Sequence, residues 1–239
     1  MKGGKLAYEF DPGISFPAYL TRNRLLKAIS SHAPSLDGRL LDFGCGSKPY
    51  RSLFTVAQYT GLDFENPGHP HVNEQIDVFY DGRRIPFNDE TFDSIFSSEV
   101  IEHVFNLNEV LVELNRVLKT GGKILITCPF AISEHEVPND FARYSSFGLR
   151  HLLEKNGFEV VQLEKTGNSV ETVFQLWIMY IHQHINPWFR KIPVVRSAFR
   201  LFTYTSLNVL ALAFSKVLPD TRDLYLNNII VCRKVKTVS

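Results

Sequence analysis

The sequence has few cysteines and no cysteine motif. Its 239 residues include only Cys45, Cys128 and Cys232, and no two of them form a Cys-x-x-Cys pair. An odd number of widely spaced cysteines argues against a disulfide framework and against a cysteine-based zinc site. We therefore expect a reducing, cytoplasmic setting for this chain, and we expect no metal site.

A surplus of one charge and long apolar runs are also missing. The chain has 26 Lys and Arg residues against 25 Asp and Glu residues. Dedicated nucleic-acid-binding domains are usually strongly basic, so this balance predicts no nucleic-acid partner. No stretch reaches the roughly 18 uninterrupted apolar residues that a membrane-spanning helix needs. The first ten residues contain no apolar segment of the kind found in signal peptides.

What the sequence does contain is an alternation of short apolar runs with amphipathic segments. The apolar runs predict strands over residues 39–43, 59–62, 75–79, 92–97, 123–127, 158–163 and 226–233. Apolar residues at helical spacing predict helices over residues 19–31, 107–118 and 146–157. Asn106 is expected to cap the second helix, Gly121 and Gly122 to end it, and Ser145 or Ser146 to cap the third. This alternation predicts an α/β fold with a mostly parallel seven-stranded sheet and helices on both faces.

The chain is predicted to be one domain with a helical insertion. Residues 1–239 divide into an N-terminal helical segment (1–38), a core (39–168), a helical insertion before the last strand (169–220), and the last strand with a tail (221–239). The insertion is apolar and aromatic, with interspersed cations. We favour a helical cap whose apolar faces are buried on the sheet or in a homodimer. The alternative is peripheral membrane contact through residues 170–218, with the cations snorkelling toward the lipid headgroups.

Polar groups follow three predicted strands at the point where each strand ends. Asp42-Phe43-Gly44-Cys45-Gly46 closes the first strand, Asp63 closes the second, and Asp81-Gly82 follows the third. Ligands of an open α/β sheet bind at the carboxyl ends of its strands. The glycines tolerate positive φ and let a ligand approach the backbone. The Asp63 carboxylate can accept hydrogen bonds from both hydroxyls of a ribose, and Asp81 beside a small residue is expected to meet an adenine edge.

The glycine turn distinguishes between two classes of cofactor. A dinucleotide site needs a third glycine for close helix packing and a helix N-terminus for the pyrophosphate. Pro49 stands at the third position here, and the Asp42 carboxylate would repel a pyrophosphate. A leading acid suits a cofactor that carries an ammonium group and a sulfonium, which indicates S-adenosylmethionine. A nucleotide-dependent oxidoreductase is the disfavoured alternative.

Several segments carry a family resemblance. Residues 42–46 resemble the glycine-rich motif of class I methyltransferases, and residues 84–95 and 97–104 resemble the type 11 methyltransferase domain. Residues 118–123 resemble the turn before that family's fifth strand, and ubiquinone and menaquinone methyltransferases are similar over the same segments. The resemblance covers residues 40–127 and extends more loosely to residue 163. It implies a Rossmann-like class I methyltransferase fold, S-adenosylmethionine as cofactor, and methyl transfer (EC 2.1.1.-) as the activity.

Carried over position by position, the resemblance implies a set of cofactor-binding residues. They are Asp42, Gly44, Cys45, Gly46, Asp63, Phe64, Asp81, Gly82, Ser98 and Glu99. A purely structural role is the alternative for several of them: an ordinary tight turn for the glycines, a helix N-cap for Asp63, and a plain turn acid for Asp81.

The catalytic and acceptor-binding candidates lie after the fourth and fifth strands. Methyl transfer requires alignment of the reactants and exclusion of water, and it requires a base only when the acceptor loses a proton. His135 and His103 are the candidate bases, although His103 can equally pack against the following helix. Asp140, Arg143 and Tyr144 are the candidate substrate-binding residues. The alternative is an Asp140–Arg143 ion pair that braces the loop, with Tyr144 buried against it.

The acceptor is expected to be a small molecule, a glycan or a lipid-type compound. The alternative function is a non-catalytic protein that keeps the fold as a binding or scaffold module. Intact Asp42, Gly44, Gly46 and Asp63 favour the enzyme, because a degenerating site would usually lose one of them.

Overall fold

The computed structural model describes residues 6–64 and 74–238. Within these residues, seven strands form one sheet in the order β3-β2-β1-β4-β5-β7-β6. The strands are β1 (Arg39–Phe43), β2 (Gln58–Phe64), β3 (Val78–Tyr80), β4 (Phe92–Ser98), β5 (Leu118–Pro129), β6 (Phe158–Lys165) and β7 (Asn227–Lys234). Neighbouring strands pair in parallel, except that β7 runs antiparallel to both β5 and β6. The predicted mostly parallel seven-stranded sheet is confirmed.

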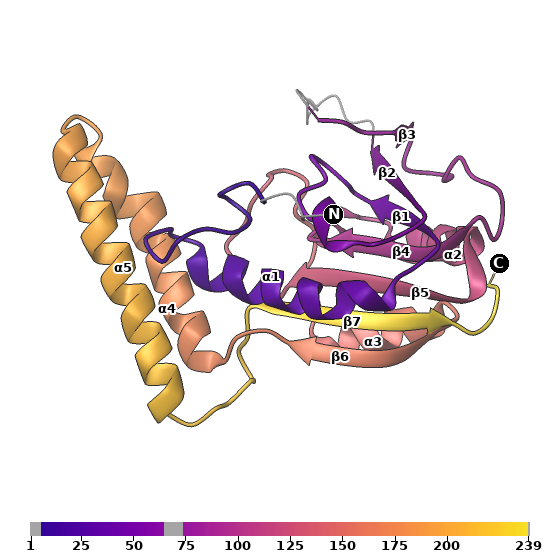
Figure 1. Cartoon of the computed structure of the whole chain (residues 1–239). Helices are drawn as coiled ribbons and strands as arrows, with labels where there is room; N and C mark the ends of the chain where they lie inside the picture. The colour runs from indigo at the N-terminus through magenta and orange to yellow at the C-terminus, as the bar shows by residue number, and fades with distance from the viewer. Residues whose placement is uncertain (1–5, 65–73, 239) are drawn as a thin grey trace.

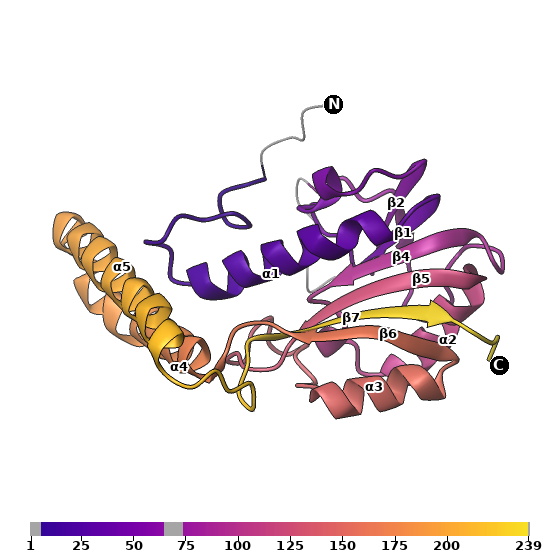
Figure 2. The ribbon, with the colours of Figure 1, turned by 60° about the horizontal axis from the view of Figure 1, so that its bottom comes forward.

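Helices cover both faces of this sheet. The helices are α1 (Tyr19–His32), α2 (Leu107–Val117), α3 (Ser146–Lys155), α4 (Ser169–Tyr180) and α5 (Pro193–Val217). In Figure 1 α1 runs along the direction of β5 and β7, and Figure 2 shows α1 on one face of the sheet with α2 and α3 on the other. This arrangement confirms the Rossmann-like class I fold expected from the sequence.

The core is divided between the two faces because β1 is buried on both. Leu41 and Phe43 pack on the side of α2 and α3, whereas Leu40 packs on the side of α1. All three side chains are at most 1% exposed, and this explains why a continuous apolar run marks the strand in the sequence. Burial of each side chain contributes about 1.5–3 kcal/mol.

The fifth strand begins earlier than predicted. Gly121 and Gly122 do not end α2, because the helix ends before Leu118 and both glycines lie inside β5. The pairing of β4 with β5 shifts register between Phe92 and Ser94, so the glycines fall in an irregular part of the ladder. Gly121 adopts a φ of +82° there, a conformation that glycine tolerates best.

The predicted helix caps have different outcomes. Ser145 caps α3 as predicted, since its Oγ accepts a hydrogen bond from the Gly148 backbone N–H at 3.2 Å. Asn106 precedes α2 but makes no capping hydrogen bond. Its Nδ2 donates instead to Oε2 of Glu109 at 2.8 Å. The third strand is also shorter than expected, because it covers only Val78–Tyr80.

The insertion forms a helical hairpin at the edge where β4 and β5 end. Figure 1 shows α4 and α5 side by side and projecting beyond the sheet. Several hydrogen bonds tie the hairpin to the N-terminal segment, among them an ion pair between Arg24 and Glu171 and two amide contacts. Nε2 of Gln175 donates to the Pro17 carbonyl at 2.8 Å, and Nδ2 of Asn208 donates to the Ile14 carbonyl at 2.7 Å.

Many apolar side chains of this hairpin face outward. Trp188 and Phe202 are among them, at 77% and 76% exposed. The expectation that the insertion buries its apolar faces on the sheet is therefore wrong for these side chains, because the hairpin packs on the N-terminal segment instead. Burial in a homodimer and membrane contact stay predictions. Among the described residues, none of the helices combines the length and apolarity needed to cross a bilayer.

Candidate active site

The predicted glycine turn joins β1 to the following segment. Gly44 and Gly46 have φ values of +73° and +45°, so both need the left-handed backbone region that the sequence predicted for them. A Cβ on Gly44 would collide with the side chain of Val100, so Gly44 is required by packing. A Cβ on Gly46 would meet no atom of the described residues closer than Oε1 of Glu74, at 3.7 Å. The turn is therefore open at Gly46, where a ligand can approach the backbone.

Asp63 lies directly against this turn. Its Oδ2 accepts a hydrogen bond from the Gly46 backbone N–H at 2.7 Å, and its Oδ1 accepts one from the Phe64 N–H, also at 2.7 Å. The two strands carry these groups to the same edge because β1 and β2 pair in parallel, with Phe43 opposite Leu62. The predicted closeness of the glycine turn and the Asp63 carboxylate is confirmed. The alternative N-cap role for Asp63 involves residues that lie outside the described part of the chain.

The ends of β2 and β3 are also side by side. Phe64 pairs with Tyr80 in register, and their rings pack edge to face with centroids 6.0 Å apart. A Cβ on Gly82 would lie only 2.8 Å from the Phe64 ring. Asp81 is exposed and its Oδ1 accepts from the Arg83 backbone N–H at 3.0 Å, which lowers the pKa of this carboxyl. Asp81 thus makes the turn contact that was its alternative role, and its contact with adenine stays a prediction.

Asp42 supports the turn from below. Its side chain is 3% exposed and accepts a hydrogen bond from the Tyr59 hydroxyl. Burial raises the pKa of Asp42 to about 7. Cys45 is equally buried, and burial raises the pKa of its thiol as well. A direct contact between either residue and a cofactor stays a prediction.

Lys48 is part of the same turn and was not among the residues predicted for the site. Its Nζ donates to Oδ2 of Asp77 at 2.7 Å, and the same oxygen accepts from the Gly61 backbone N–H at 2.6 Å. These contacts lower the pKa of the Asp77 carboxyl. The ion pair joins the turn after β1 to the segment before β3.

Ser98 and Glu99 lie at the end of β4, where they meet residues from β5 and β7. The Ser98 and Thr127 hydroxyls are 2.9 Å apart, and Thr127 Oγ1 also donates to Oε1 of Glu99 at 2.9 Å. Nδ2 of Asn227 donates to Oε2 of Glu99 at 2.7 Å. Burial raises the pKa of the Glu99 carboxyl, and the two donors oppose that shift. Sequence reasoning missed Thr127 and Asn227, whose roles depend on strand order.

The two predicted catalytic histidines are in contact. The rings of His103 and His135 pack edge to face with centroids 4.7 Å apart. Nδ1 of His103 lies 2.8 Å from the Asn139 carbonyl, which holds the ring on the loop. The loop is attached a second time, because the Phe141 backbone N–H donates to the Glu102 carbonyl at 2.9 Å. The structure therefore brings both histidines to one place at the carboxyl edge of the sheet.

The three predicted acceptor-binding residues brace their own loop. Nη1 and Nη2 of Arg143 donate to the two carboxylate oxygens of Asp140, each at 2.6 Å. This ion pair lowers the pKa of Asp140 to about 2. Tyr144 is half-buried, and its carbonyl accepts from Nδ2 of Asn228 at 2.8 Å. The geometry matches the ion-pair alternative, and contact of these residues with an acceptor stays a prediction.

Residues 41–126 match the family model described as a methyltransferase domain. This range contains the glycine turn, Asp63 and the end of β4, as well as most of β5. Residues 41–126 therefore form a methyltransferase domain of the class I type, which uses S-adenosylmethionine. The match ends before the helical hairpin, so the family model gives no information about the insertion.

Individual relatives agree with this assignment. This methyltransferase is 25% identical to the O-methyltransferase cnsE of Penicillium expansum over 209 residues, which cover 74% of this chain and 73% of that protein. It is 34% identical to the human mitochondrial ubiquinone biosynthesis O-methyltransferase over 126 residues. The latter match covers 44% of this chain and 33% of the human protein.

The fold is shared with a solved structure of a protein named for a different reaction. The crystal structure of the [4+2]-cyclase SpnF superposes with a TM-score of 0.55 at 18% identity, over 91% of this chain and 82% of that chain. At this identity the likeness concerns the fold alone. The reaction has to be argued from the site, because one fold can support several chemistries.

The described residues around the turn fit the cofactor. Gly46 leaves its Cβ position open, and the Asp63 carboxylate lies beside it as a hydrogen-bond acceptor for hydroxyl groups. A polar cleft of about 510 Å³ lies elsewhere, between α1, the end of β6 and the hairpin, and it includes Lys27, Glu164 and Lys216 in its lining. None of the predicted site residues lines this cleft.

Proposed function

We propose that this methyltransferase binds S-adenosylmethionine along the carboxyl ends of β1, β2 and β4, and methylates an oxygen of a small molecule that carries a lipid-type tail. The main observation that supports this cofactor site is the 2.7 Å hydrogen bond from the Gly46 N–H to Asp63 Oδ2. It joins the turn that would hold the methionine end of the cofactor to the carboxylate that would hold its ribose.

Each residue has a defined role in this proposal. Asp63 accepts hydrogen bonds from the ribose hydroxyls, and the backbone from Gly44 to Gly46 orients the methionine end. Ser98 and Glu99 line the open side from which the acceptor approaches. When bound, S-adenosylmethionine supplies an electrophilic methyl group on a sulfonium. The acceptor oxygen forms a bond to that methyl group as the carbon–sulfur bond breaks, so alignment is the main contribution of the protein.

The two histidines would accept the proton of a hydroxyl acceptor. Nδ1 of His103 is held by the Asn139 carbonyl at 2.8 Å, so Nε2 is the nitrogen that is left for the acceptor. His135 packs against the same ring. The names of the two relatives, both O-methyltransferases, support oxygen as the methylated atom.

The outward apolar face of the hairpin supports a lipid-type acceptor. Trp177, Trp188 and Phe202 are exposed on it, and exposed apolar groups that gather on one element mark interaction surfaces. The hairpin also reaches the loop that holds the histidines, because Nε2 of Gln183 lies 3.2 Å from the Ser133 hydroxyl. The ubiquinone-biosynthesis relative supports an acceptor with an isoprenoid tail.

A transfer assay tests this acceptor class. The protein is incubated with S-adenosylmethionine labelled in its methyl group, in the presence of lipid vesicles, with a phenol that carries an isoprenoid tail or with the same phenol without a tail. We expect kcat/KM to be at least about tenfold higher for the tailed phenol, which corresponds to about 1.4 kcal/mol of binding. Equal kcat/KM values for the two phenols would refute the lipid-type acceptor.

A further inference from the structure

A buried carboxylate without a partner lies beside the two histidines. Glu102 is 0% exposed, and within residues 6–64 and 74–238 neither of its carboxylate oxygens has a hydrogen-bond partner. Leaving a buried charge unpaired is costly, and such groups are usually paired, hydrogen-bonded or bound to a metal ion. The nearby Arg143 makes no hydrogen bond to Glu102: two of its nitrogens donate to Asp140, and its buried Nε has no hydrogen-bond partner among the described residues. The unpaired carboxylate therefore calls for a cation.

The histidines provide the other ligands. Oε1 of Glu102 lies 3.7 Å from Nε2 of His103. One ligand atom from each of Glu102, His103 and His135 can be chosen so that all three lie within 4.8 Å of one another. Three protein ligands gathered in this way are typical of a metal site that keeps a position open for water or substrate.

The surroundings hold the His103 ring in an orientation suited to metal binding, because its Nδ1 lies 2.8 Å from the Asn139 carbonyl. Nδ1 of His135 lies 3.3 Å from both the Ser133 carbonyl and Nη2 of Arg143, so this ring is held from the same side. A ring N–H donated to a carbonyl fixes the tautomer and leaves Nε2 free as a ligand. Histidine residues at metal sites almost always have a second partner of this kind.

We propose that Glu102, His103 and His135 bind one divalent transition-metal ion, for which Zn²⁺ is the reference. Two imidazole nitrogens and one carboxylate oxygen form a ligand set that suits zinc and neighbouring transition metals better than Mg²⁺ or Ca²⁺. Glu136 is a further ligand candidate, because its Oε2 lies 3.8 Å from Nε2 of His103. The site uses residues from the segment after β4 and from the loop after β5.

The metal site also suggests a role in the proposed methyl transfer, and this role rests on the proposed function. With the ion bound, the histidine nitrogens would be ligands and not bases. The open coordination position would then take the acceptor hydroxyl, whose proton the ion makes easier to lose to solvent water. Metal binding itself does not depend on methyl transfer, so it can be measured on the free protein.

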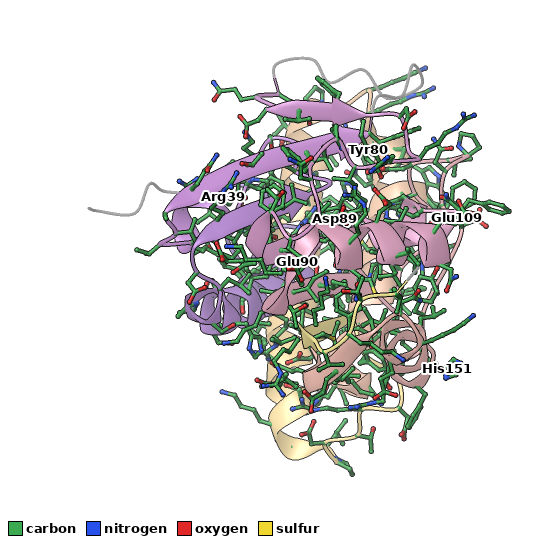
Figure 3. All side chains as sticks on the ribbon, turned by 90° about the vertical axis from the view of Figure 1, so that its right-hand side faces the viewer. Arg39, Tyr80, Asp89, Glu90, Glu109 and His151 are labelled. Atoms are coloured by element: carbon green, nitrogen blue, oxygen red, sulfur yellow. The ribbon has the colours of Figure 1, made fainter. Side chains whose placement is uncertain are left out.

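The test is a titration of the full-length, chelator-treated protein with ZnCl₂, followed by calorimetry and by metal analysis after desalting. We expect one equivalent of zinc for the wild type, and an affinity at least tenfold lower for His135→Asn. The matched control is His151→Asn, a residue exposed on α3 that Figure 3 shows at the rim of the molecule. This control should bind zinc like the wild type.

Glu102→Gln separates the ligand role from a fold defect. The substitution removes the unpaired buried charge, so we expect the metal-free variant to melt at the same temperature as the wild type or higher, and to lose the stabilisation that zinc gives the wild type. Zinc binding that is equal in the wild type, His135→Asn and Glu102→Gln would overturn the proposal. Binding of S-adenosylmethionine, measured on the same metal-free samples, tests the proposed function separately.

Discussion

The Tyr59 hydroxyl donates a hydrogen bond to the buried carboxylate of Asp42, directly beneath the glycine turn. The contact joins β2 to β1 at the point where the cofactor is proposed to bind. Asp42 is 3% exposed and Tyr59 is partly buried, so this hydrogen bond stabilises the turn from within the protein. Two predictions follow from it, one for each partner.

The first prediction concerns Tyr59→Phe. The substitution keeps the ring but leaves the Asp42 carboxylate without its donor, so the free energy of unfolding should fall by about 1–3 kcal/mol. Urea denaturation at pH 8 measures this change. Tyr8→Phe, at an exposed tyrosine, is the control and should leave the midpoint unchanged. An unaltered midpoint for Tyr59→Phe would show that the hydrogen bond has no net effect on stability.

The second prediction concerns the pH dependence that Asp42 causes. Its pKa is about 7 in the folded protein, against 3.8 for the ordinary group, so the folded state holds a proton that the unfolded chain has lost. The stability from this proton is fully present below about pH 4 and is lost as the pH rises through 7. Asp42→Asn cannot titrate. Between pH 5 and pH 8 the wild type should therefore lose about 2 kcal/mol more than this variant, and parallel curves would contradict the assignment.

The third prediction concerns the braced loop. Asp140→Asn removes the negative charge of the ion pair with Arg143. The two hydrogen bonds of this pair, each 2.6 Å long, stabilise the loop of residues 133–144. We expect the free energy of unfolding to fall by about 1–3 kcal/mol in the absence of any acceptor. Thermal unfolding measures this change. The exposed pair Arg233–Glu159 provides a control, because Glu159→Gln should cost at most about 1 kcal/mol. If Asp140→Asn kept the stability of the wild type but lost methyl transfer, the result would favour a role of Asp140 in acceptor binding over a role in stabilising the loop.

The fourth prediction concerns the hairpin. The combined substitution Trp188→Ser and Phe202→Ser removes exposed apolar area that is proposed to meet lipid, so the protein should float less with anionic liposomes. Phe147→Ser on α3 is the matched control, because Phe147 is 79% exposed and lies outside the hairpin. Equal flotation of all three proteins would remove the support for a membrane-facing hairpin.

The fifth prediction concerns the ribose carboxylate. Asp63→Ala should weaken binding of S-adenosylmethionine by about 1–3 kcal/mol, since the ribose hydroxyls lose their acceptor. Isothermal titration calorimetry gives the affinity directly. Asp220→Ala, at an exposed aspartate after α5, should bind like the wild type. Unchanged affinity in Asp63→Ala would place the ribose elsewhere.

The strands and the glycine turn could be predicted because their signals are local. β1 matched residue for residue, as Leu40, Leu41 and Phe43 are apolar and buried on both faces. The position of Asp63 beside the turn followed from parallel pairing alone. The irregular start of β5 could not be predicted, because Gly121 and Gly122 are placed by the register shift against β4.

The acceptor side was less predictable, since its contacts join residues far apart in the chain. Asn227 reaches Glu99 only because β7 inserts between β5 and β6. The role of Glu102 could not be predicted from the sequence, because its burial without a hydrogen-bond partner among the described residues is a property of the packed structure. Figure 3 shows the opposite edge of the sheet, where β1 begins at Arg39 and where Asp89 and Glu90 precede β4. None of these three residues was predicted to belong to the site.

The central claim is that S-adenosylmethionine binds between the glycine turn and Asp63. A crystal structure of the protein with S-adenosylhomocysteine tests this claim most directly. We expect the ribose hydroxyls within hydrogen-bonding distance of the Asp63 carboxylate, and the sulfur facing the end of β4. A ligand bound in the polar cleft beside α1, or anywhere away from Gly46 and Asp63, would contradict the account.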